Sequence, residues 1–282
     1  TRHSTLFPYT TLFRSSCLIT GLALLAISGC SAPLHSQTSF NKLVWSDEFN
    51  YQGLPDSTKW GYDRGTGCPD VCGWGNNELQ YYTWNRKENA RVENGKLLIE
   101  ARKEPMESKN YTSARLVTKN KGHWKYGRIE IRAQLPAGRG MWPAIWMLPE
   151  KWEYGGWPRS GEIDIMENVG YMPDSVFGTV HTEAYNGMLG TQKTKGLLCR
   201  DLAEQFHIYS IEWTPEYISF RMDGKEYNLF RNDQKSIAAW PFDQEFHLLL
   251  NIAVGGNWGG KKGVDDGVFP QQMKIDWVRV YQ

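Results

Sequence analysis

The sequence predicts an all-β fold, a jelly-roll sandwich of two curved antiparallel sheets. From about residue 40 the 282-residue chain is a succession of short apolar runs bounded by turn residues, and few runs are long enough for a helix. Strands do not alternate with helical segments, as a parallel α/β sheet would require. No linker or internal repeat divides residues 41–282, so we expect one domain there.

The expected strands follow one another closely. The clearest covers residues 126–135, where isoleucine, alanine and leucine alternate with charged and amide residues as in a half-buried strand. An Asn-Gly pair at 94–95 and an Asp-Gly pair at 223–224 predict tight hairpin turns. In chain order we expect strands at residues 43–49, 95–101, 113–119, 126–135, 141–148, 162–167, 175–182, 206–213, 217–222, 225–230, 246–254 and 274–281. Large curved sheets offer a concave trough for an extended polymer, although architecture alone does not give function.

The first forty residues differ from the rest. Residues 1–16 contain a near-repeat and no methionine, so we interpret them as a sequence artefact or as unstructured. Residues 17–30 form an apolar run that is too short for a comfortable membrane span and fits a secretory signal. The run ends in Ile-Ser-Gly-Cys, which resembles a bacterial lipobox with Cys30 as the lipidated residue, and residues 31–40 form a short linker. We therefore expect an exported bacterial protein, either secreted or held at the outer membrane or cell surface by a lipid anchor.

Composition favours a carbohydrate ligand over a nucleic acid. The chain contains 13 Trp, 14 Tyr and 11 Phe, and its net charge is +1. A nearly neutral chain offers no electrostatic attraction for nucleic acid or for an anionic membrane surface. Aromatic rings pack well against the C–H faces of sugars, although we expect about half of these residues to lie in the core. We expect a monomer whose only membrane contact is the N-terminal lipid anchor.

The acidic segment from Gly161 to Gly170 organises the functional prediction, because it holds three carboxylates within six residues. In strict strand alternation Glu162 and Asp164 share one face, whereas Glu167 falls on the other face with the isoleucines. An unpaired charge in the core is costly. We therefore predict a one-residue β-bulge at Met166, which returns Glu167 to the face of the other two acids.

Three neighbouring carboxylates indicate a catalytic site. Like charges raise one another's pKa, which suits acid–base chemistry better than stability. Two structural interpretations stay open, namely a solvated strand edge and a calcium site built from acids. The apolar neighbours Ile163, Ile165 and Val169 argue against an exposed edge, and calcium loops usually alternate acids with Gly and Asn in irregular segments.

Other segments add candidate contacts. Trp142 and Trp146 lie four residues apart on one face of an expected strand, either in the core or as sugar platforms beside the acids. Residues 73–82 mix amides, acids and aromatics that suit either sugar hydroxyls or ordinary turns. His181 follows a strand-like run and is able to face the same trough.

Motifs argue against several alternative sites. The glycine-rich residues 255–262 lack the spacing and the Ser or Thr of a phosphate loop. No His-x-x-x-His pair supports a catalytic zinc, and no Gly-x-Ser-x-Gly elbow supports a serine hydrolase. Cys68 and Cys72 form a close pair, for which a disulfide is favoured over a zinc site that lacks two further ligands. Cys199 is expected to be a buried free thiol.

The acidic run at residues 162–167, Glu-Ile-Asp-Ile-Met-Glu, resembles the signature of glycoside hydrolase family 16 in its bulged, laminarinase-type form. The resemblance covers residues 41–281. Flanking segments agree in the same order, at residues 74–82, 126–136, 140–148, 251–258 and 275–281. The resemblance implies a β-jelly-roll with a sugar-binding cleft on its concave sheet and cleavage of β-glycosidic bonds with retention.

The resemblance also implies roles for individual residues. Glu162 corresponds to the nucleophile and Glu167 to the general acid and base, with Asp164 between them to modulate the charge of Glu162. A retaining pair needs carboxyl groups only about 5–5.5 Å apart. Substrate contacts are implied at Asn76, Arg115, Trp124, Trp142, Trp146, His181 and Trp258. No cofactor is implied for catalysis, but a structural calcium is implied on the convex side. Its ligands would be Glu48, the Gly95 carbonyl and Asp276.

The leading interpretation is an endo-acting β-1,3-glucanase of laminarin-like β-glucans. One alternative keeps the fold and mechanism but changes the polymer to a mixed-linkage glucan or a galactan, because the loops that select the glycan cannot be placed from the sequence. Another alternative is a non-catalytic surface glycan-binding protein, which would need the aromatic trough but not three intact acids.

Overall fold

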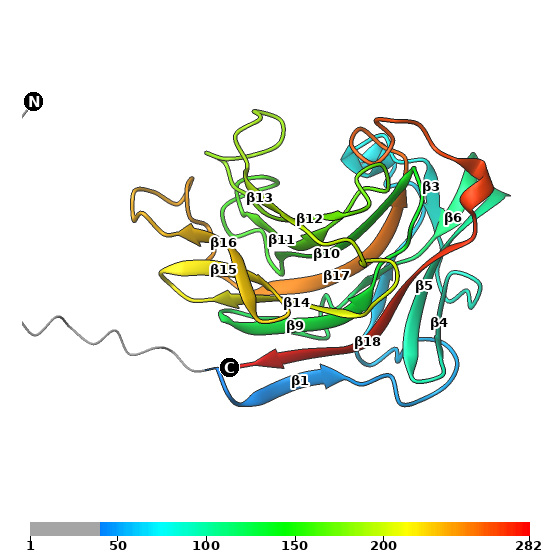
Figure 1. Cartoon of the computed structure of the whole chain (residues 1–282). Helices are drawn as coiled ribbons and strands as arrows, with labels where there is room; N and C mark the ends of the chain where they lie inside the picture. Colours follow the sequence, from blue (N-terminus) through cyan, green and yellow to red (C-terminus); the bar gives the residue numbers. More distant parts are fainter. Residues whose placement is uncertain (1–39) are drawn as a thin grey trace, which may run out of the picture. The chain divides into compact units, whose positions relative to one another are not determined.

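Two β-sheets packed face to face make up nearly all of the computed structural model, which describes residues 40–282 (Figure 1). The predicted jelly-roll class is confirmed. Two short 3-10 helices, η1 (Cys72–Gly75) and η2 (Asp266–Val268), lie in connections between strands. Within residues 40–282, no helix has the length and apolar character needed to cross a bilayer.

The first sheet has ten strands. Its order is β16 (Lys225–Arg231), β15 (Tyr217–Met222), β14 (His207–Trp213), β9 (Gly127–Gln134), β18 (Gln271–Tyr281), β5 (Lys96–Met106), β6 (Lys109–Ser113) and β3 (Gln80–Tyr82), with β1 (Leu43–Asp47) beside β18 and β4 (Ala90–Glu93) beside β5. The pair β3–β6 is parallel, and the other pairs are antiparallel. The long strands show the expected alternation, since Ile129, Ile131 and Ala133 of β9 are buried and the residues between them are partly exposed.

The second sheet has eight strands, all paired antiparallel. Its order is β13 (Lys193–Leu198), β12 (Ser175–His181), β11 (Glu162–Glu167), β10 (Met141–Pro149), β17 (Phe246–Val254), β7 (Arg115–Val117) and β2 (Gly61–Asp63), with β8 (His123–Trp124) beside β17. In Figure 1 the strands β10 and β17 curve strongly, and loops rise above the face that points away from the first sheet.

One hydrophobic core fills the space between the sheets. It combines side chains such as Ile129 and Ile131 from the first sheet with Ile145, Met147 and Leu250 from the second, each completely buried. Burying one such side chain stabilises the fold by about 1.5–3 kcal/mol relative to leaving it in water. Because the core uses one face of the second sheet, the opposite face of that sheet is free to carry a binding site.

The cysteines agree in part with expectation. Cys68 and Cys72 form the expected disulfide in the loop that leads into η1. Cys199 is a free thiol, but it is half-buried rather than buried, because it follows the exposed edge strand β13.

Several N-terminal predictions lie outside the described residues. These are the artefact at 1–16, the signal at 17–30 with its lipidated Cys30, and all but the last residue of the linker at 31–40. They stay predictions. The residues from 40 onward belong to one compact unit.

Candidate active site

The acidic segment forms β11, which lies between β10 and β12 in the second sheet. Its pairing with β12 shifts between Asp164 and Glu167, where Ile165 and Met166 together lie opposite the single residue Gly178. Both apolar side chains are buried in the core. The predicted β-bulge is therefore confirmed, and it turns Glu167 to the same outer face as Asp164.

The bulge brings Glu167 into a row of side chains that crosses the sheet. From β2 to β12, the register pairs the following residues in turn: Asp63, Arg115, Asn251, Ala144, Glu167 and Phe177. Directly paired residues of antiparallel strands point to the same face. Parts of the chain that are far apart in sequence therefore share one surface around the acids.

Indole N–H groups orient the two glutamates. Trp142 Nε1 donates to Glu167 Oε1 at 3.1 Å, and Trp157 Nε1 donates to Glu162 Oε2 at 2.8 Å. Among residues 40–282, neither glutamate forms an ion pair with a lysine or an arginine. A neutral donor orients a carboxyl group without holding it permanently ionised, which leaves Glu167 able to gain and lose a proton.

His181 at the end of β12 faces the same acids. The Gly187 N–H donates to His181 Nδ1 at 3.1 Å, so Nδ1 carries no proton, and the proton of the neutral ring is on Nε2. Nε2 lies 3.3 Å from Asp164 Oδ2 and 3.9 Å from Glu162 Oε1. The protonated nitrogen of the ring therefore lies beside both acids, without a hydrogen bond to Asp164 Oδ2.

The environment of the acids changes their protonation. Burial raises the pKa of Asp164 well above its usual range, and the charge of Glu162 and a hydrogen bond to it raise this pKa further. Burial also raises the pKa of Glu167 well above its usual range, followed by the charge of Asp164. The electrostatic interaction with His181 and the indole hydrogen bond from Trp142 oppose that rise. Asp164 and Glu167 thus keep their protons at pH values where an ordinary carboxyl group is ionised.

Trp142 and Trp146 lie on the outer face of β10. Their neighbours Met141, Ile145 and Met147 are completely buried in the core, whereas the two indoles are only partly buried. Trp146 Nε1 donates to Asn251 Oδ1 at 2.7 Å, which fixes its ring in the row of side chains. Of the two interpretations that the sequence left open, the structure therefore supports rings beside the acids.

Arg115 lies between aromatic rings at one end of this row. Its guanidinium is 4.5 Å from the centroid of Trp74 and 4.9 Å from that of Trp146. Arg115 Nε also lies 2.8 Å from Asp63 Oδ2, and its side chain is only 10% exposed. Cation–π contacts of this kind hold aromatic rings in place. Arg115 therefore restricts the motion of the Trp146 ring.

The remaining predicted contacts lie around Trp142. The ring of Trp258 is 5.5 Å from Trp142 and 5.3 Å from Phe177, edge-on to both. Asn76 is partly exposed, and its carbonyl accepts the Asn257 N–H at 2.7 Å. This bond places the segment after η1 beside the loop that carries Trp258.

Trp124 is the exception among the predicted substrate contacts. It lies in β8 opposite Phe246, is only 6% exposed, and packs edge-on against Trp45 with ring centroids 5.5 Å apart. The expectation that it lines the cleft is wrong, because the pairing of β8 with β17 turns its ring into the core.

Both carboxylates expected to bind calcium are paired with arginines. Arg279 binds both carboxylate oxygens of Glu48, at 2.9 and 2.8 Å, and Arg132 Nη1 lies 2.5 Å from Asp276 Oδ2. Gly95 occupies the turn between β4 and β5 with φ of +70°. Calcium prefers carboxylate and carbonyl oxygens that are free to coordinate it. As arranged here, the set does not fit the ion, since arginines already neutralise both carboxylates.

Two residues that orient the site were not predicted individually. Trp157 lies in the loop before β11, and its only signal in the sequence is its place five residues upstream of Glu162. Asn251 links Trp146 to Tyr82, because its Nδ2 donates to the Tyr82 hydroxyl at 3.0 Å. Its signal was only the start of the resembling segment at residues 251–258.

Comparisons with known proteins agree with this geometry. The family model described as "Glycosyl hydrolases family 16" matches residues 77–279. The chain belongs to glycosyl hydrolase family 16. A beta-glucanase of Rhodothermus marinus is 57% identical over 248 residues, which cover 86% of this chain and 85% of that protein. The X-ray structure of the laminarinase from Rhodothermus marinus superposes with a TM-score of 0.83 at 56% identity, covering 86% of this chain and 97% of that one.

A further relative carries sugar in its active site. A mutant of a non-specific endo-β-1,3(4)-glucanase from family 16 matches with a TM-score of 0.82 at 48% identity, over 86% of this chain and 94% of that one. It was co-crystallised with 1,3-β-D-cellotriosyl-glucose and presents 1,3-β-D-cellobiosyl-glucose at its active site. This family 16 chain is thus a glycoside hydrolase, and hydrolases of the family need no cofactor for catalysis.

Proposed function

We propose that this family 16 hydrolase is an endo-β-1,3-glucanase that cleaves laminarin-like β-glucans with retention. The observation that carries the proposal is the bulged strand with Glu162, Asp164 and Glu167 on one face. The names of the relatives, a beta-glucanase, a laminarinase and an endo-β-1,3(4)-glucanase, support the same substrate class. Retention is typical of the family.

In the first step Glu162 is the nucleophile. Its carboxylate oxygen bonds to the anomeric carbon while the glycosidic C–O bond breaks, and Glu167 gives its proton to the departing oxygen. The raised pKa of Glu167 keeps that proton in place in the resting enzyme. Asp164 donates a hydrogen bond to Glu162 and so orients the attacking carboxylate.

In the second step Glu167 acts as the base. It takes a proton from water, the water oxygen bonds to the anomeric carbon, and Glu162 leaves as a free carboxylate. The charge of Glu162 raises the pKa of Glu167 in the resting enzyme. That charge is lost when Glu162 is glycosylated, so the pKa of Glu167 falls when the residue has to accept a proton again.

Surfaces on both sides of the acids suit a polymer. On one side the rings of Trp142 and Trp146 offer apolar faces for sugar rings. On the other side a groove of about 440 Å³ is lined by residues that include Trp157, Arg159 and Met188. A site with sugar-binding surface on both sides of the scissile bond favours cleavage inside a chain over removal of terminal units.

The experiment that tests the proposal measures new reducing ends from laminarin. We expect steady release by the wild type and none by Glu162→Ala, whose circular dichroism spectrum and melting temperature should match the wild type because Glu162 lies at the surface of the sheet. NMR of the first products should show the β-anomer. Full activity in a folded Glu162→Ala protein would refute the assignment, and laminarin binding without new reducing ends would favour the glycan-binding alternative.

Hydrolysis profiles separate the enzyme alternatives. Laminarin, lichenan, agarose and carrageenan should be compared at equal mass concentration, and we expect the highest kcat/KM on laminarin. The relative named as a non-specific endo-β-1,3(4)-glucanase is the reason to include a mixed-linkage glucan. Faster hydrolysis of lichenan or of a galactan would keep the mechanism and replace the substrate.

The calcium that the resemblance implies at Glu48, the Gly95 carbonyl and Asp276 can be tested separately, through its effect on stability. The ion would have to displace Arg279 from Glu48 and Arg132 from Asp276. If it binds, the melting temperature of protein treated with a chelator should rise when calcium is added at 100 times its dissociation constant, by the equivalent of about 2.7 kcal/mol. An unchanged melting temperature would mean that the arginines alone hold these carboxylates.

Export, lipidation and a monomeric state are proposed from the sequence. The lipobox-like run ending at Cys30 motivates the first two, and the mass of the protein purified from bacterial membranes would test them. A mass without added diacylglycerol and fatty acid would reject lipidation. Light scattering of the purified protein, with an expected molar mass near that of one chain, would test the monomer.

A further inference from the structure

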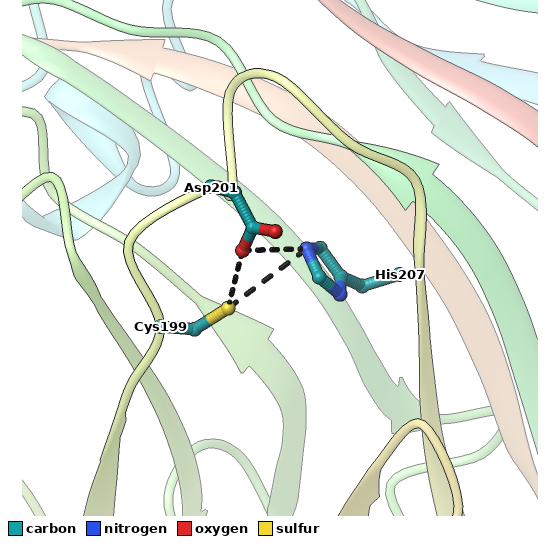
Figure 2. Close-up of side chains that lie close together, drawn as sticks. All are labelled: Cys199, Asp201 and His207. Atoms are coloured by element: carbon teal, nitrogen blue, oxygen red, sulfur yellow. Dashed lines mark hydrogen bonds and ion pairs between the residues drawn. The ribbon is translucent and has the colours of Figure 1, made fainter.

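A second cluster of ionisable side chains lies where β13 leads into β14. Figure 2 shows Cys199, Asp201 and His207 pointing toward one another. Cys199 Sγ lies 2.9 Å from Asp201 Oδ1 and 3.8 Å from His207 Nε2, and Asp201 Oδ1 lies 3.3 Å from His207 Nε2. The proposed hydrolysis uses none of these three side chains.

The backbone holds this cluster in place. The Cys199 N–H donates to the Asp174 carbonyl at 2.8 Å, and the Leu135 N–H donates to the Leu202 carbonyl at 2.9 Å. Leu202 is buried in the core, and the side chain of His207, at the start of β14, is only 10% exposed. The three polar side chains therefore project from fixed backbone.

Asp223 orients the His207 ring from the opposite side. Asp223 lies in the turn between β15 and β16, where its Oδ2 is 2.7 Å from His207 Nδ1 and its Oδ1 accepts the Ile208 N–H at 2.8 Å. Because a carboxylate only accepts, Nδ1 carries the proton, and Nε2 of the neutral ring presents a lone pair. That lone pair faces Asp201 Oδ1, so two acceptors meet at 3.3 Å, and a cation between them would relieve their repulsion. A carboxylate behind the ring is also the usual arrangement of metal-binding histidines.

We propose that Cys199, Asp201 and His207 bind a zinc-type divalent cation through Sγ, a carboxylate oxygen and Nε2. A thiolate and an imidazole favour zinc over calcium or magnesium. A tetrahedral zinc ion with ordinary bond lengths separates sulfur from nitrogen by about 3.6 Å, nitrogen from oxygen by about 3.3 Å and sulfur from oxygen by about 3.5 Å. The corresponding distances are 3.8, 3.3 and 2.9 Å, so only the sulfur–oxygen pair has to open appreciably.

Metal binding replaces the thiol proton of Cys199 with the metal ion. The Cys199 thiol loses its proton to solvent as the bond from Sγ to the metal forms, and Asp201 turns from that thiol proton to the metal. Three protein ligands leave a fourth position for water. The ion would link the β13–β14 connection to the β15–β16 turn through His207 and Asp223. It would thereby restrict the motion of these two connections.

The test uses Co²⁺ as a spectroscopic substitute for zinc. The full chain carries Cys17→Ser and Cys30→Ser, because those two cysteines also offer thiols. One equivalent of Co²⁺ should produce a thiolate-to-cobalt charge-transfer band and tetrahedral d–d bands, and one equivalent of Zn²⁺ should remove both. Adding Cys199→Ser should abolish the charge-transfer band and leave laminarin hydrolysis unchanged.

His123→Gln is the matched control. His123 also lies near two carboxylates, 3.8 Å from Glu150 and 3.5 Å from Glu245, but it has no cysteine beside it. This variant should leave the cobalt spectrum unchanged, whereas His207→Gln should weaken cobalt binding about tenfold or more. Cobalt held by His181 and its acids would give no thiolate band, so the active site does not confuse the measurement.

A second measurement needs no change in the cluster. In the same Cys17→Ser and Cys30→Ser background Cys199 is the one free thiol, since Cys68 and Cys72 form a disulfide. Zinc should slow its reaction with an aromatic disulfide reagent about tenfold or more. A cobalt spectrum without a thiolate band, or equal thiol reactivity with and without zinc, would overturn the proposal and leave a proton as the cation between His207 and Asp201.

Discussion

Two histidines of this enzyme lie beside carboxylates and are oriented in opposite ways. At the active site a backbone N–H donates to His181 Nδ1, so the ring turns an Nε2–H toward Asp164. In the second cluster His207 Nδ1 faces the carboxylate of Asp223, so the ring turns an Nε2 lone pair toward Asp201. One ring carries its proton on the side of the acids, and the other presents a lone pair to a carboxylate oxygen.

The difference shows that the group bound to Nδ1 of a histidine decides whether Nε2 carries a proton or a lone pair. At the active site burial raises the pKa of Asp164 and of Glu167, and the proposed reaction uses the proton that Glu167 keeps. In the second cluster the hydrogen bond from Cys199 is the main reason that the pKa of Asp201 is lowered, and this carboxylate stays ionised. The same residue types therefore store a proton in one place and favour a cation in the other.

The largest expected effect comes from Glu167→Gln, which removes the proton that the active site stores. We expect kcat on laminarin to fall by about 10²–10⁴, because general acid catalysis is lost. A dinitrophenyl β-glycoside of laminaribiose has a leaving group that needs no proton. The rate of its first step, which forms the glycosyl-enzyme, should therefore fall much less. Comparing burst and steady-state rates on the two substrates checks this, with Glu245→Gln as an exposed control. Equal losses on both substrates would contradict the role of proton donor.

The second cluster should respond to Asp223→Asn. Asparagine offers one acceptor oxygen to the two donors that Asp223 now serves, His207 Nδ1 and the Ile208 N–H. It also tolerates the positive φ of 50° at this position, so the turn should persist. We expect cobalt affinity to fall about 10–100-fold with hydrolysis unchanged, as measured by spectroscopic titration. Unchanged affinity would mean that Asp223 does not set the tautomer of His207.

Asp164→Asn should change how stability depends on pH. Because the folded-state pKa of Asp164 is raised, its stabilising contribution is full below the unfolded value of about 3.9 and is lost as pH rises toward the folded pKa. Asparagine cannot ionise. The free energy of unfolding of the variant should therefore rise relative to that of the wild type by up to about 1.4 kcal/mol for each pH unit across that interval. Urea unfolding from pH 4 to pH 9 measures the difference, and parallel curves would show that Asp164 is not held protonated.

Trp142→Phe should give the smallest effect. Its indole N–H lowers the pKa of Glu167, so its loss should move the alkaline limb of the kcat/KM profile to higher pH. A hydrogen bond worth about 1 kcal/mol corresponds to a shift of somewhat less than about one pH unit. Trp146→Phe is the matched control, because its N–H donates to Asn251 instead of an acid. Similar shifts in both variants would point to a change in packing.

Much of the fold could be predicted from the sequence, because the long strands carry their own pattern. The runs at 126–135 and 141–148 correspond to β9 and β10 within one residue at each end. The strands β2, β3 and β8 have only two or three residues and therefore no period to detect. The strand β13 is mostly exposed, and only its pairing with β12 makes it a strand.

The shared face of the three acids was equally predictable, since their unusual order among apolar residues required the bulge. What the sequence could not supply were contacts between distant segments. Whether a tryptophan faces the core or the cleft depends on its partner strand, and nothing near Trp124 in the sequence shows that β8 turns it into the core. Likewise, nothing near Glu48 or Asp276 in the sequence reveals that Arg279 and Arg132 reach them.

The row of side chains across the second sheet has a consequence for folding. Glu167 lies two strands from Asn251 and three from Arg115, although long stretches of chain separate all three in sequence. Contacts of such high contact order form late, because the entropy of closing large loops has to be overcome first. Activity should therefore return only with the last cooperative step of refolding, which makes hydrolysis a reporter of the completed sheet.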